Sequence, residues 1–444
     1  MNTAPAAVLN PLAVAANEAI ATANPTVLAV LSERGKRFYF PAKGILAQGA
    51  EAKQKAKTAN ATIGIATEGG TPMHLPCVHR YYTGLTPAEV YDYSPSYGKP
   101  DLRAAWAKKQ RDETPSLGAH PVSNPVVTNA LTHGLAVLGD LFLDPGDVAL
   151  SSDLMWENYN LSWETRLGAR IQTYPFFDTK LTGFNISAFT QAVAEHKGRK
   201  LVVALNFPNN PSGYTPTVAE AGAIVNILTA AAQVGTKLVV ICDDAYYGMF
   251  YDPACVQESI FGRLAQAHEN LLAVKVDGGT KEAFVWGLRV GFLTYGVKGG
   301  TPALYKALED KTAGLIRAVI SNVTTSGQSV LLKALSDPAY PGERAAKVAI
   351  LKARAAITAT ACHKAEYADC WDVYPFNSGY FMCLRLKDGI SSEAVRVRLL
   401  DEHGTGTIAL GTSDLRVAFS CLTDAQIPGV FSAIAATVRA VRGH

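Results

Sequence analysis

Six short apolar runs are the feature of this sequence that most constrains its fold. They lie at residues 148–150, 171–176, 201–205, 238–242, 271–276 and 290–295. Because most of these runs are continuously apolar rather than alternating, they are typical of strands buried on both faces of a parallel sheet. Ala-rich helical stretches such as 217–233 lie between several of them, so the sequence predicts an α/β fold whose mostly parallel sheet is flanked by helices.

The chain changes character past about residue 330. Residues 337–342 contain two prolines and a glycine and should break any helix. The segments 343–365, 371–386, 391–402 and 414–442 then predict, in order, a long helix, a strand, a helix, and a strand followed by a helix. We therefore predict an N-terminal arm with part of a small domain at 1–60, a large domain at 61–330, and a smaller α+β domain at 331–444.

The composition narrows the class of protein. Apolar residues make up 48% of the 444-residue chain, which is enough to bury a large core. The net charge is only +3 and no basic block stands out, which disfavours nucleic acid as a partner. No run of 18 apolar residues exists, so we expect no membrane span. The N-terminus lacks a basic region and is broken by Pro11 and Asn17, so we expect no signal peptide.

The seven cysteines indicate reduced thiols rather than a disulfide framework. Their number is odd, no two have the CxxC spacing, and a core of this size needs no covalent staples. Reduced thiols are typical of the cytoplasm, which is the location we expect. The sequence predicts no metal site. Disulfide pairing is the less favoured alternative.

Polar residues follow three neighbouring apolar runs, at the point where each run ends. Residues 206–213 follow one run, Asp243 follows the next, and Lys281 lies a few residues past the third. In parallel α/β sheets, functional groups gather at the carboxyl ends of the strands. The sequence therefore predicts a functional site that contains these residues.

Three of the residue types at this edge suit one kind of chemistry. Lys281 lies in a glycine-rich loop, and a buried lysine with a lowered pKa can form a Schiff base with an aldehyde. Arg289, eight residues later, can hold a phosphate in two hydrogen bonds, and Asp243 can pair with a protonated pyridine nitrogen. The alternatives are a solvated surface lysine, a helix N-cap aspartate and, for 207–213, a plain turn.

The ordered motifs resemble a known family. Asn-Asn-Pro-Ser-Gly at 209–213, Asp-x-Ala-Tyr at 243–246, and Thr-Lys at 280–281 with Arg289 behind it resemble the fold type I pyridoxal-phosphate (PLP) enzymes. More narrowly, they are similar to the class I/II aminotransferases of the aspartate and aromatic type. The resemblance covers most of the chain. It implies the PLP-dependent transferase fold, with pyridoxal 5′-phosphate bound by the domain at 61–330.

The resemblance also implies an activity and an assembly. The protein would move an amino group between an L-amino acid and a 2-oxo acid by a ping-pong mechanism. The pair 2-oxoglutarate and glutamate would be one of its substrate pairs. It would form a homodimer with shared active sites.

The family's cofactor contacts transfer residue by residue. Lys281 matches the Schiff-base lysine, which would also move the Cα proton as general acid and base. Asp243 matches the partner of the pyridine nitrogen, Asn210 and Tyr246 match the two groups that bond the ring hydroxyl, and Arg289 matches the phosphate arginine. The remaining implied cofactor contacts are Ala130, Leu131 and Thr132 of the phosphate cup, Thr280, Trp156 stacked on the ring, and Tyr93 from the neighbouring subunit. For Trp156, a core position is the alternative.

The resemblance assigns four substrate contacts. Arg416 matches the arginine that binds the α-carboxylate, Gly64 matches the glycine that lines the pocket, and Asn210 contacts the substrate as well as the ring. Arg317 matches an arginine that comes from the neighbouring subunit to bind a distal carboxylate. A solvated helix arginine is an equally supported reading of Arg317.

Two departures and several alternatives remain. The family often has a serine where this chain has Gly278, and a glycine where it has Ala130, which predicts weaker cofactor binding.

A β-lyase, a decarboxylase or a cyclopropane-forming synthase would share Lys281, Asp243 and Arg289. A non-catalytic PLP-binding regulator is a further alternative, but the residues before Gly64 contain no basic recognition helix.

Overall fold

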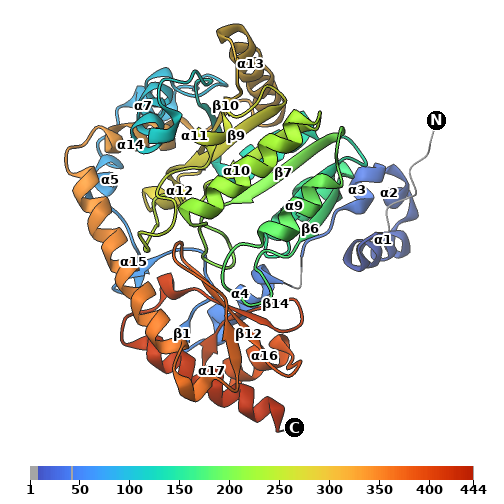
Figure 1. The fold of residues 1–444 in the computed structure, drawn as a ribbon, viewed down its shortest axis with the longest axis vertical. Coiled ribbons are helices and arrows are strands. Elements are labelled where there is room, and N and C mark those ends of the chain that lie inside the picture. Colours follow the sequence, from blue (N-terminus) through green and yellow to red (C-terminus); the bar gives the residue numbers. More distant parts are fainter. Residues whose placement is uncertain (1–8, 42–43, 444) are drawn as a thin grey trace.

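A seven-stranded sheet lies at the centre of the computed structural model, which describes residues 9–41 and 44–443 (Figure 1). Its strand order is β4-β10-β9-β8-β7-β5-β6. The strands are β4 (Val126–Asn129), β5 (Val148–Ser152), β6 (Arg170–Tyr174), β7 (Lys200–Asn206), β8 (Lys237–Asp243), β9 (Leu271–Gly278) and β10 (Val290–Gly296). All neighbours are parallel except that β10 is antiparallel to both β9 and β4. The predicted mostly parallel sheet is confirmed.

Each central strand is buried on both faces, which explains its continuous apolar sequence. In β8, Val239 and Ile241 pack into one core together with α8 (Ala130–Phe142). Leu238 and Val240 pack into the second core, together with α9 (Ile186–Ala194) and α10 (Val218–Gln233). A strand in this position is apolar at every residue whether it runs parallel or antiparallel. The reversed direction of β10 therefore leaves no trace in the hydrophobic pattern.

The C-terminal part forms a second sheet, with the strand order β11-β12-β15-β14. The strands are β11 (Trp371–Val373), β12 (Met382–Leu386), β14 (Ile408–Leu410) and β15 (Asp414–Val417). The prediction of one strand over 371–386 is wrong, because residues 374–381 form a loop between β11 and β12. In this loop the Asn377 and Ser378 N–H groups both donate to the Gly213 carbonyl, so the chain contacts the loop that follows β7 instead of pairing in the small sheet.

A long helix, α15 (Tyr340–Cys362), connects the two parts (Figure 1). Residues 337–342 were expected to break any helix, but only 336–339 lie outside α14 (Thr325–Leu335) and α15. Pro341 lies in the first turn of α15, where a helix does not need the missing N–H. The remaining elements are α5 (Pro76–Tyr81), α6 (Pro87–Tyr91), α7 (Pro100–Glu113), α11 (Phe261–Leu264), α12 (Gly279–Glu282), α13 (Pro302–Val319), α16 (Ser392–His403), α17 (Gln426–Arg442), β2 (Thr67–Glu68) and β3 (Thr71–Pro72).

The N-terminal segment divides between two places. Its first three helices, α1 (Pro11–Ala23), α2 (Pro25–Val30) and α3 (Glu33–Arg37), lie at the side of the large sheet (Figure 1). The next elements, α4 (Ile45–Lys55) and β1 (Ala59–Asn60), pack on the C-terminal part, where β1 pairs with β13 (Thr405–Gly406). The boundaries at 1–60, 61–330 and 331–444 stay predictions, and residues 1–8 of the expected non-signal N-terminus lie outside the described residues. No helix of the described part of the chain is long and apolar enough to cross a membrane.

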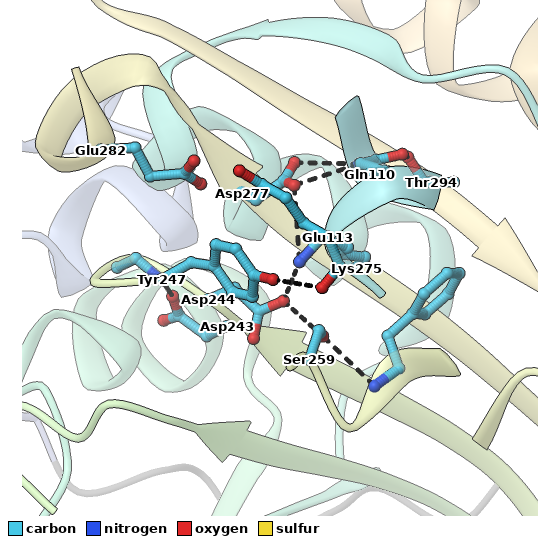
Figure 2. Close-up of polar contacts among 12 residues, drawn as sticks. Gln110, Glu113, Asp243, Asp244, Tyr247, Ser259, Lys275, Asp277, Glu282 and Thr294 are labelled. Atoms are coloured by element: carbon cyan, nitrogen blue, oxygen red, sulfur yellow. Dashed lines mark hydrogen bonds and ion pairs between the residues drawn. The ribbon is translucent and has the colours of Figure 1, made fainter. Parts of the chain in front are cut away.

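A buried ionic network lies beneath the carboxyl ends of β8 and β9 (Figure 2). Lys275 bonds the carboxylate of Asp244, and its Nζ lies 3.5 Å from Oδ2 of Asp277. Asp244 also accepts from Ser259 at 2.6 Å. The Asp277 carboxylate accepts from Trp106 and from Gln110. Because these groups come from four separate segments, the network holds the strand that ends in Asp243 against its neighbours.

We predict that Lys275→Met strongly destabilises the protein. The substitution leaves the carboxylates of Asp244 and Asp277 buried without their cation, and breaking a buried pair in this way costs about 3–5 kcal/mol. Urea unfolding followed by circular dichroism should show a clear shift to lower denaturant. The control is Lys298→Met, which alters an exposed lysine and should leave the unfolding curve in place. Equal curves for the two variants would contradict the prediction.

Candidate active site

One cavity of about 1010 Å³ lies beyond the carboxyl ends of β7 and β8 and beside Lys281, and it gathers most of the predicted residues. Those that line it are Gly64, Leu131, Thr132, Trp156, Asn210, Asp243, Tyr246, Lys281 and Arg416. Those that do not line it are Tyr93, Ala130, Thr280, Arg289 and Arg317. Segments more than 350 residues apart, such as those of Gly64 and Arg416, therefore meet at one site together with the residues that follow the strands of the large sheet.

Asp243 is a buried carboxylate that faces this cavity. It accepts a hydrogen bond from the Tyr159 hydroxyl at 2.5 Å and one from the Ala245 N–H at 3.2 Å. Burial raises the pKa of Asp243 to about 6, although the Tyr159 bond and the charge of Lys281 act to lower it. The adjacent Asp244 is directed to Lys275 instead. Of the two neighbouring aspartates, Asp243 is therefore the one available to a ligand.

Lys281 lies in α12, immediately after β9, with its Nζ 4.7 Å from the centre of the Tyr246 ring. Burial lowers the pKa of Lys281 to about 8. The charge of Asp243 opposes this shift and the charge of Arg289 adds to it. A lysine with such a pKa is partly unprotonated near neutral pH, which is the form that attacks a carbonyl carbon.

Arg416 places a buried cation in the same cavity. Its Nη2 donates to the Thr62 carbonyl at 2.9 Å and its Nη1 to Asn210 Oδ1 at 3.2 Å. The guanidinium lies 4.3 Å above the ring of Phe381, and its buried Nε has no hydrogen-bond partner. Within the described residues Arg416 forms no ion pair, so an anionic ligand would supply the missing charge.

The N-terminus of α8 forms a second anion-binding region. The helix begins at Ala130, which has a φ of +62° and whose N–H donates to the Arg289 carbonyl at 3.0 Å. The hydroxyl of Thr280, the residue before Lys281, is buried and has no hydrogen-bond partner among the residues that the structure describes. Free N–H groups at a helix start together with an unpartnered hydroxyl suit a phosphate. These residues therefore fit the phosphate of the expected cofactor.

The departure at Gly278 has a steric cause. A Cβ at this position would lie 2.6 Å from the Val290 carbonyl oxygen and 2.8 Å from Gly291 Cα. The serine that the family often has here cannot be accommodated without a backbone shift. The departure at Ala130 is of the opposite kind, because its left-handed conformation favours glycine and costs a non-glycine residue about 1–2 kcal/mol.

Arg289, Tyr93 and Arg317 lie away from the cavity lining. Arg289 has an exposed side chain, and its Nη1 donates to the Trp286 carbonyl at 3.4 Å. Tyr93 is 91% exposed, and Arg317 donates to Ser321 Oγ at 2.6 Å. Neither Tyr93 nor Arg317 reaches the cavity of its own chain. Their predicted roles both depend on a second subunit and stay predictions.

The sequence profile of the family described as "Aminotransferase class I and II" matches residues 86–434. The chain belongs to this family. Members of the class I and II aminotransferase family are PLP-dependent transaminases, and pyridoxal 5′-phosphate is their cofactor. The site described above supplies a lysine, a carboxylate and a phosphate region that fit this cofactor.

Curated relatives and solved structures agree with the family. The mitochondrial aspartate aminotransferase of Schizosaccharomyces pombe is 24% identical over 285 residues, 63% of this chain and 62% of that protein. A probable N-succinyldiaminopimelate aminotransferase (DapC) of Mycobacterium tuberculosis is 28% identical over 194 residues, 43% of this chain and 45% of that protein. The chain thus aligns with less than two thirds of the length of either relative.

The fold is that of solved aminotransferases. An aminotransferase from Anaerococcus prevotii superposes with a TM-score of 0.80 at 22% identity, over 91% of this chain and 98% of that one. A mutant aspartate aminotransferase of Thermus thermophilus gives 0.72 at 18% identity, over 92% and 99%. The predicted PLP-dependent transferase fold is confirmed.

Sequence reasoning missed several residues of the site. Tyr159 bonds Asp243 and is stacked on Trp163 with ring centres 4.6 Å apart, just before a π-helical turn at Asn160–Thr165. No sequence motif indicates that Tyr159 contacts Asp243. The contact follows only from the folded path of the chain after Trp156. Phe381 lies in the loop that was read as strand. Two further lining residues had no predicted role, namely Glu157, directly after Trp156, and Lys53 in the N-terminal segment.

We predict that Tyr159→Phe moves the acidic limb of the pH profile of kcat/KM to higher pH. The Tyr159 hydrogen bond lowers the pKa of Asp243, so its loss raises that pKa further above about 6 and leaves less carboxylate near neutrality. We expect a fall in rate of about tenfold at pH 6 and a smaller one at pH 8. Tyr295→Phe, which removes a buried hydroxyl bonded to Thr312, is the control. An unchanged profile would show that the Tyr159 bond does not act on Asp243.

Proposed function

We propose that the protein is a transaminase that moves an amino group between an L-amino acid and a 2-oxo acid in two ping-pong half-reactions. Glutamate and 2-oxoglutarate form one of its substrate pairs. The observation that carries the proposal is that Lys281, Asp243 and Arg416 line one cavity. The two relatives are named for different substrates, aspartate and N-succinyldiaminopimelate, so their names do not agree on the amino donor.

The proposed cofactor contacts follow from these positions. Lys281 would bind the cofactor covalently through Nζ, Asp243 would pair with its ring nitrogen, and Trp156 would stack on its ring. Asn210 and Tyr246 would bond the ring hydroxyl. The residues that would hold the phosphate are Ala130, Leu131, Thr132, Thr280 and Arg289, with Tyr93 of a second subunit. When bound, the cofactor supplies an electron sink for the carbanion that forms at the substrate Cα.

The chain's own groups then orient the substrate and move its proton. Arg416 binds the α-carboxylate through its fork, and its burial makes this contact strong because water does not compete for it. Gly64 would leave room beside the substrate Cα. The nearest atom to a Cβ added at Gly64 is the far end of the Phe381 ring, at 3.8 Å. Lys281 Nζ, with its lowered pKa, would take the proton from the substrate Cα and deliver it to C4′ of the bound cofactor.

We propose a homodimer with shared active sites. The segments of Tyr93 and Arg317 lie side by side, because Ser94 Oγ donates to the Val323 carbonyl and Ser96 Oγ to the Ser321 carbonyl. Exposed apolar side chains lie in the same two segments and at the end of α5. They are Tyr82, Tyr91, Tyr93, Val319 and Ile320. An exposed apolar surface of this kind is typical of an interface. Tyr93 and Arg317 would then enter the partner's cavity together.

We also propose a cytoplasmic location. The seven cysteines are free thiols, and six of them are buried. Free thiols of this number are typical of a reducing compartment. Fractionation of cells that produce the protein tests this proposal.

We expect Lys281→Ala to abolish turnover. A panel of amino donors with 2-oxoglutarate should give glutamate with the wild type, and borohydride should fix the cofactor on the peptide that contains Lys281. The variant should show neither result. Lys298→Ala, which alters an exposed lysine, should behave as the wild type. Turnover by Lys281→Ala at the wild-type rate would refute the proposed chemistry.

We further expect two inactive variants to complement one another. In a twofold dimer of a Lys281→Ala chain and a Tyr93→Phe/Arg317→Ala chain, one of the two sites has every residue intact. Random pairing makes half of the dimers mixed, so activity with a dicarboxylic donor should return to about a quarter of the wild-type level. Co-expression with two affinity tags isolates the mixed dimer. No recovery in the mixed dimer would mean that the sites are not shared.

A further inference from the structure

One face of α4 lines the cavity. The residues of this face are Ile45, Leu46, Gly49, Ala50 and Lys53. Their spacing of i, i+1, i+4, i+5 and i+8 is that of a single helical face.

The other sides of α4 are fixed to the C-terminal part of the protein. The side chain of Gln48 forms two hydrogen bonds with the backbone of Ala409, at 2.7 and 3.1 Å. Glu51 accepts from Arg396 at 2.9 Å. Because the helix is anchored on these sides, its cavity face is held in place as a wall.

The cavity face ends in Lys53. This residue has an exposed side chain and forms no ion pair with any of the residues described. Two residues later, Lys55 pairs with Glu51 and Asp401, so these acids near the end of α4 are engaged with that lysine. Within the described part of the chain, Lys53 is thus an unpaired cation at the wall of the cavity.

Lys53 lies within reach of a substrate held by Arg416. A Cβ at Gly49 would lie 3.9 Å from Thr62 Oγ1, and the carbonyl of Thr62 accepts from Arg416. Lys53 lies about 6 Å further along the helix axis, and side chains of a helix lean toward its N-terminus, here toward Gly49. A substrate with its α-carboxylate on Arg416 can therefore extend along α4 to Lys53.

The charges beside α4 differ between its two ends, with an acid at the start of the helix and a lysine near its end. Glu157 also lines the cavity, and its Oε2 would lie 3.2 Å from a Cβ at Gly44, directly before the helix. Glu157 thus lies about 13 Å from Lys53 along the axis. An anionic group is repelled from the start of α4 and attracted to its end. The other charged residues of the lining, Asp243, Lys281 and Arg416, already have proposed partners.

We infer that Lys53 is a specificity-determining residue that binds an anionic group at the far end of the amino donor's side chain. The preferred donors carry this group on an apolar stem longer than that of glutamate. Ile45 and Leu46 provide an apolar surface for the stem, and Gly49 and Ala50 leave space for it. The inference rests on the proposed transamination. It differs from the Arg317 proposal because Lys53 acts within one chain.

The test is a chain-length series on the holoenzyme. The donors are aspartate, glutamate, 2-aminoadipate and 2-aminopimelate, with norleucine as the uncharged comparison. For the wild type, kcat/KM should be highest with one of the two longest acids. Lys53→Met should lower kcat/KM for these two acids by roughly 10- to 100-fold, the worth of one charge-assisted hydrogen bond. Its effect on norleucine should stay within about twofold.

Two further variants make the outcome specific. Lys57→Met, which alters an exposed lysine outside the cavity lining, should leave the whole series unchanged. Lys53→Glu should reverse the preference, so that ornithine and lysine gain relative to 2-aminopimelate. A merely structural role of Lys53 would lower all donors alike and would not produce this reversal.

A binding measurement separates Lys53 from the chemistry. Pimelate, which has two carboxylates and no amino group, should raise the melting temperature of the wild type more than heptanoate does. Lys53→Met should remove this difference. Equal responses of all donors to Lys53→Met, or a wild-type optimum at aspartate or glutamate, would overturn the inference and leave transamination standing. A wild type that transaminates none of the donors would overturn both.

Discussion

Asp243 is a carboxylate buried at the end of a strand without a cation bonded to it, and the site is arranged around this unfavourable burial. Within the described residues its hydrogen bonds come from one tyrosine hydroxyl and one backbone N–H. Such a group is stable only if the surrounding fold is rigid and a positive charge arrives with the ligand. The Lys275 network beneath it supplies the rigidity, since it neutralises the adjacent Asp244 and joins β8 to β9. A protonated ring nitrogen would supply the charge.

The main elements of the site could be predicted from the sequence because strand ends are visible in it. Each apolar run stops at the carboxyl edge of the sheet. Asp243 and Lys281 could therefore be assigned to that edge from the sequence alone. The direction of β10 could not be predicted, because central strands are apolar in either orientation. Nor could Tyr159 or Phe381 be predicted, because a π-helical turn places Tyr159 against Asp243 and a loop places Phe381 beneath Arg416.

The two departures from the family are related in space. A Cβ on Gly291 would lie 2.7 Å from the carbonyl carbon of Ala130, and a Cβ on Gly278 would lie 2.8 Å from Gly291 Cα. The three residues therefore pack backbone against backbone beside the start of α8. This chain has a methyl group where the family has glycine and glycine where the family often has serine. In the proposed site, cofactor binding would then depend more on Thr280 and on the helix N-terminus than the usual motif suggests.

Because α4 is anchored on the C-terminal part, the proposed substrate selection and the proposed reaction chemistry belong to different segments of the chain. The groups proposed to carry the reaction follow β8 and β9 in the large sheet, whereas the proposed wall beside the substrate side chain belongs to a short helix more than 180 residues earlier. Mutations in that helix would then alter which molecules are accepted without disturbing the reacting groups. New substrate preferences would evolve in this protein, or be selected in the laboratory, through changes in the few codons that encode residues 45–53.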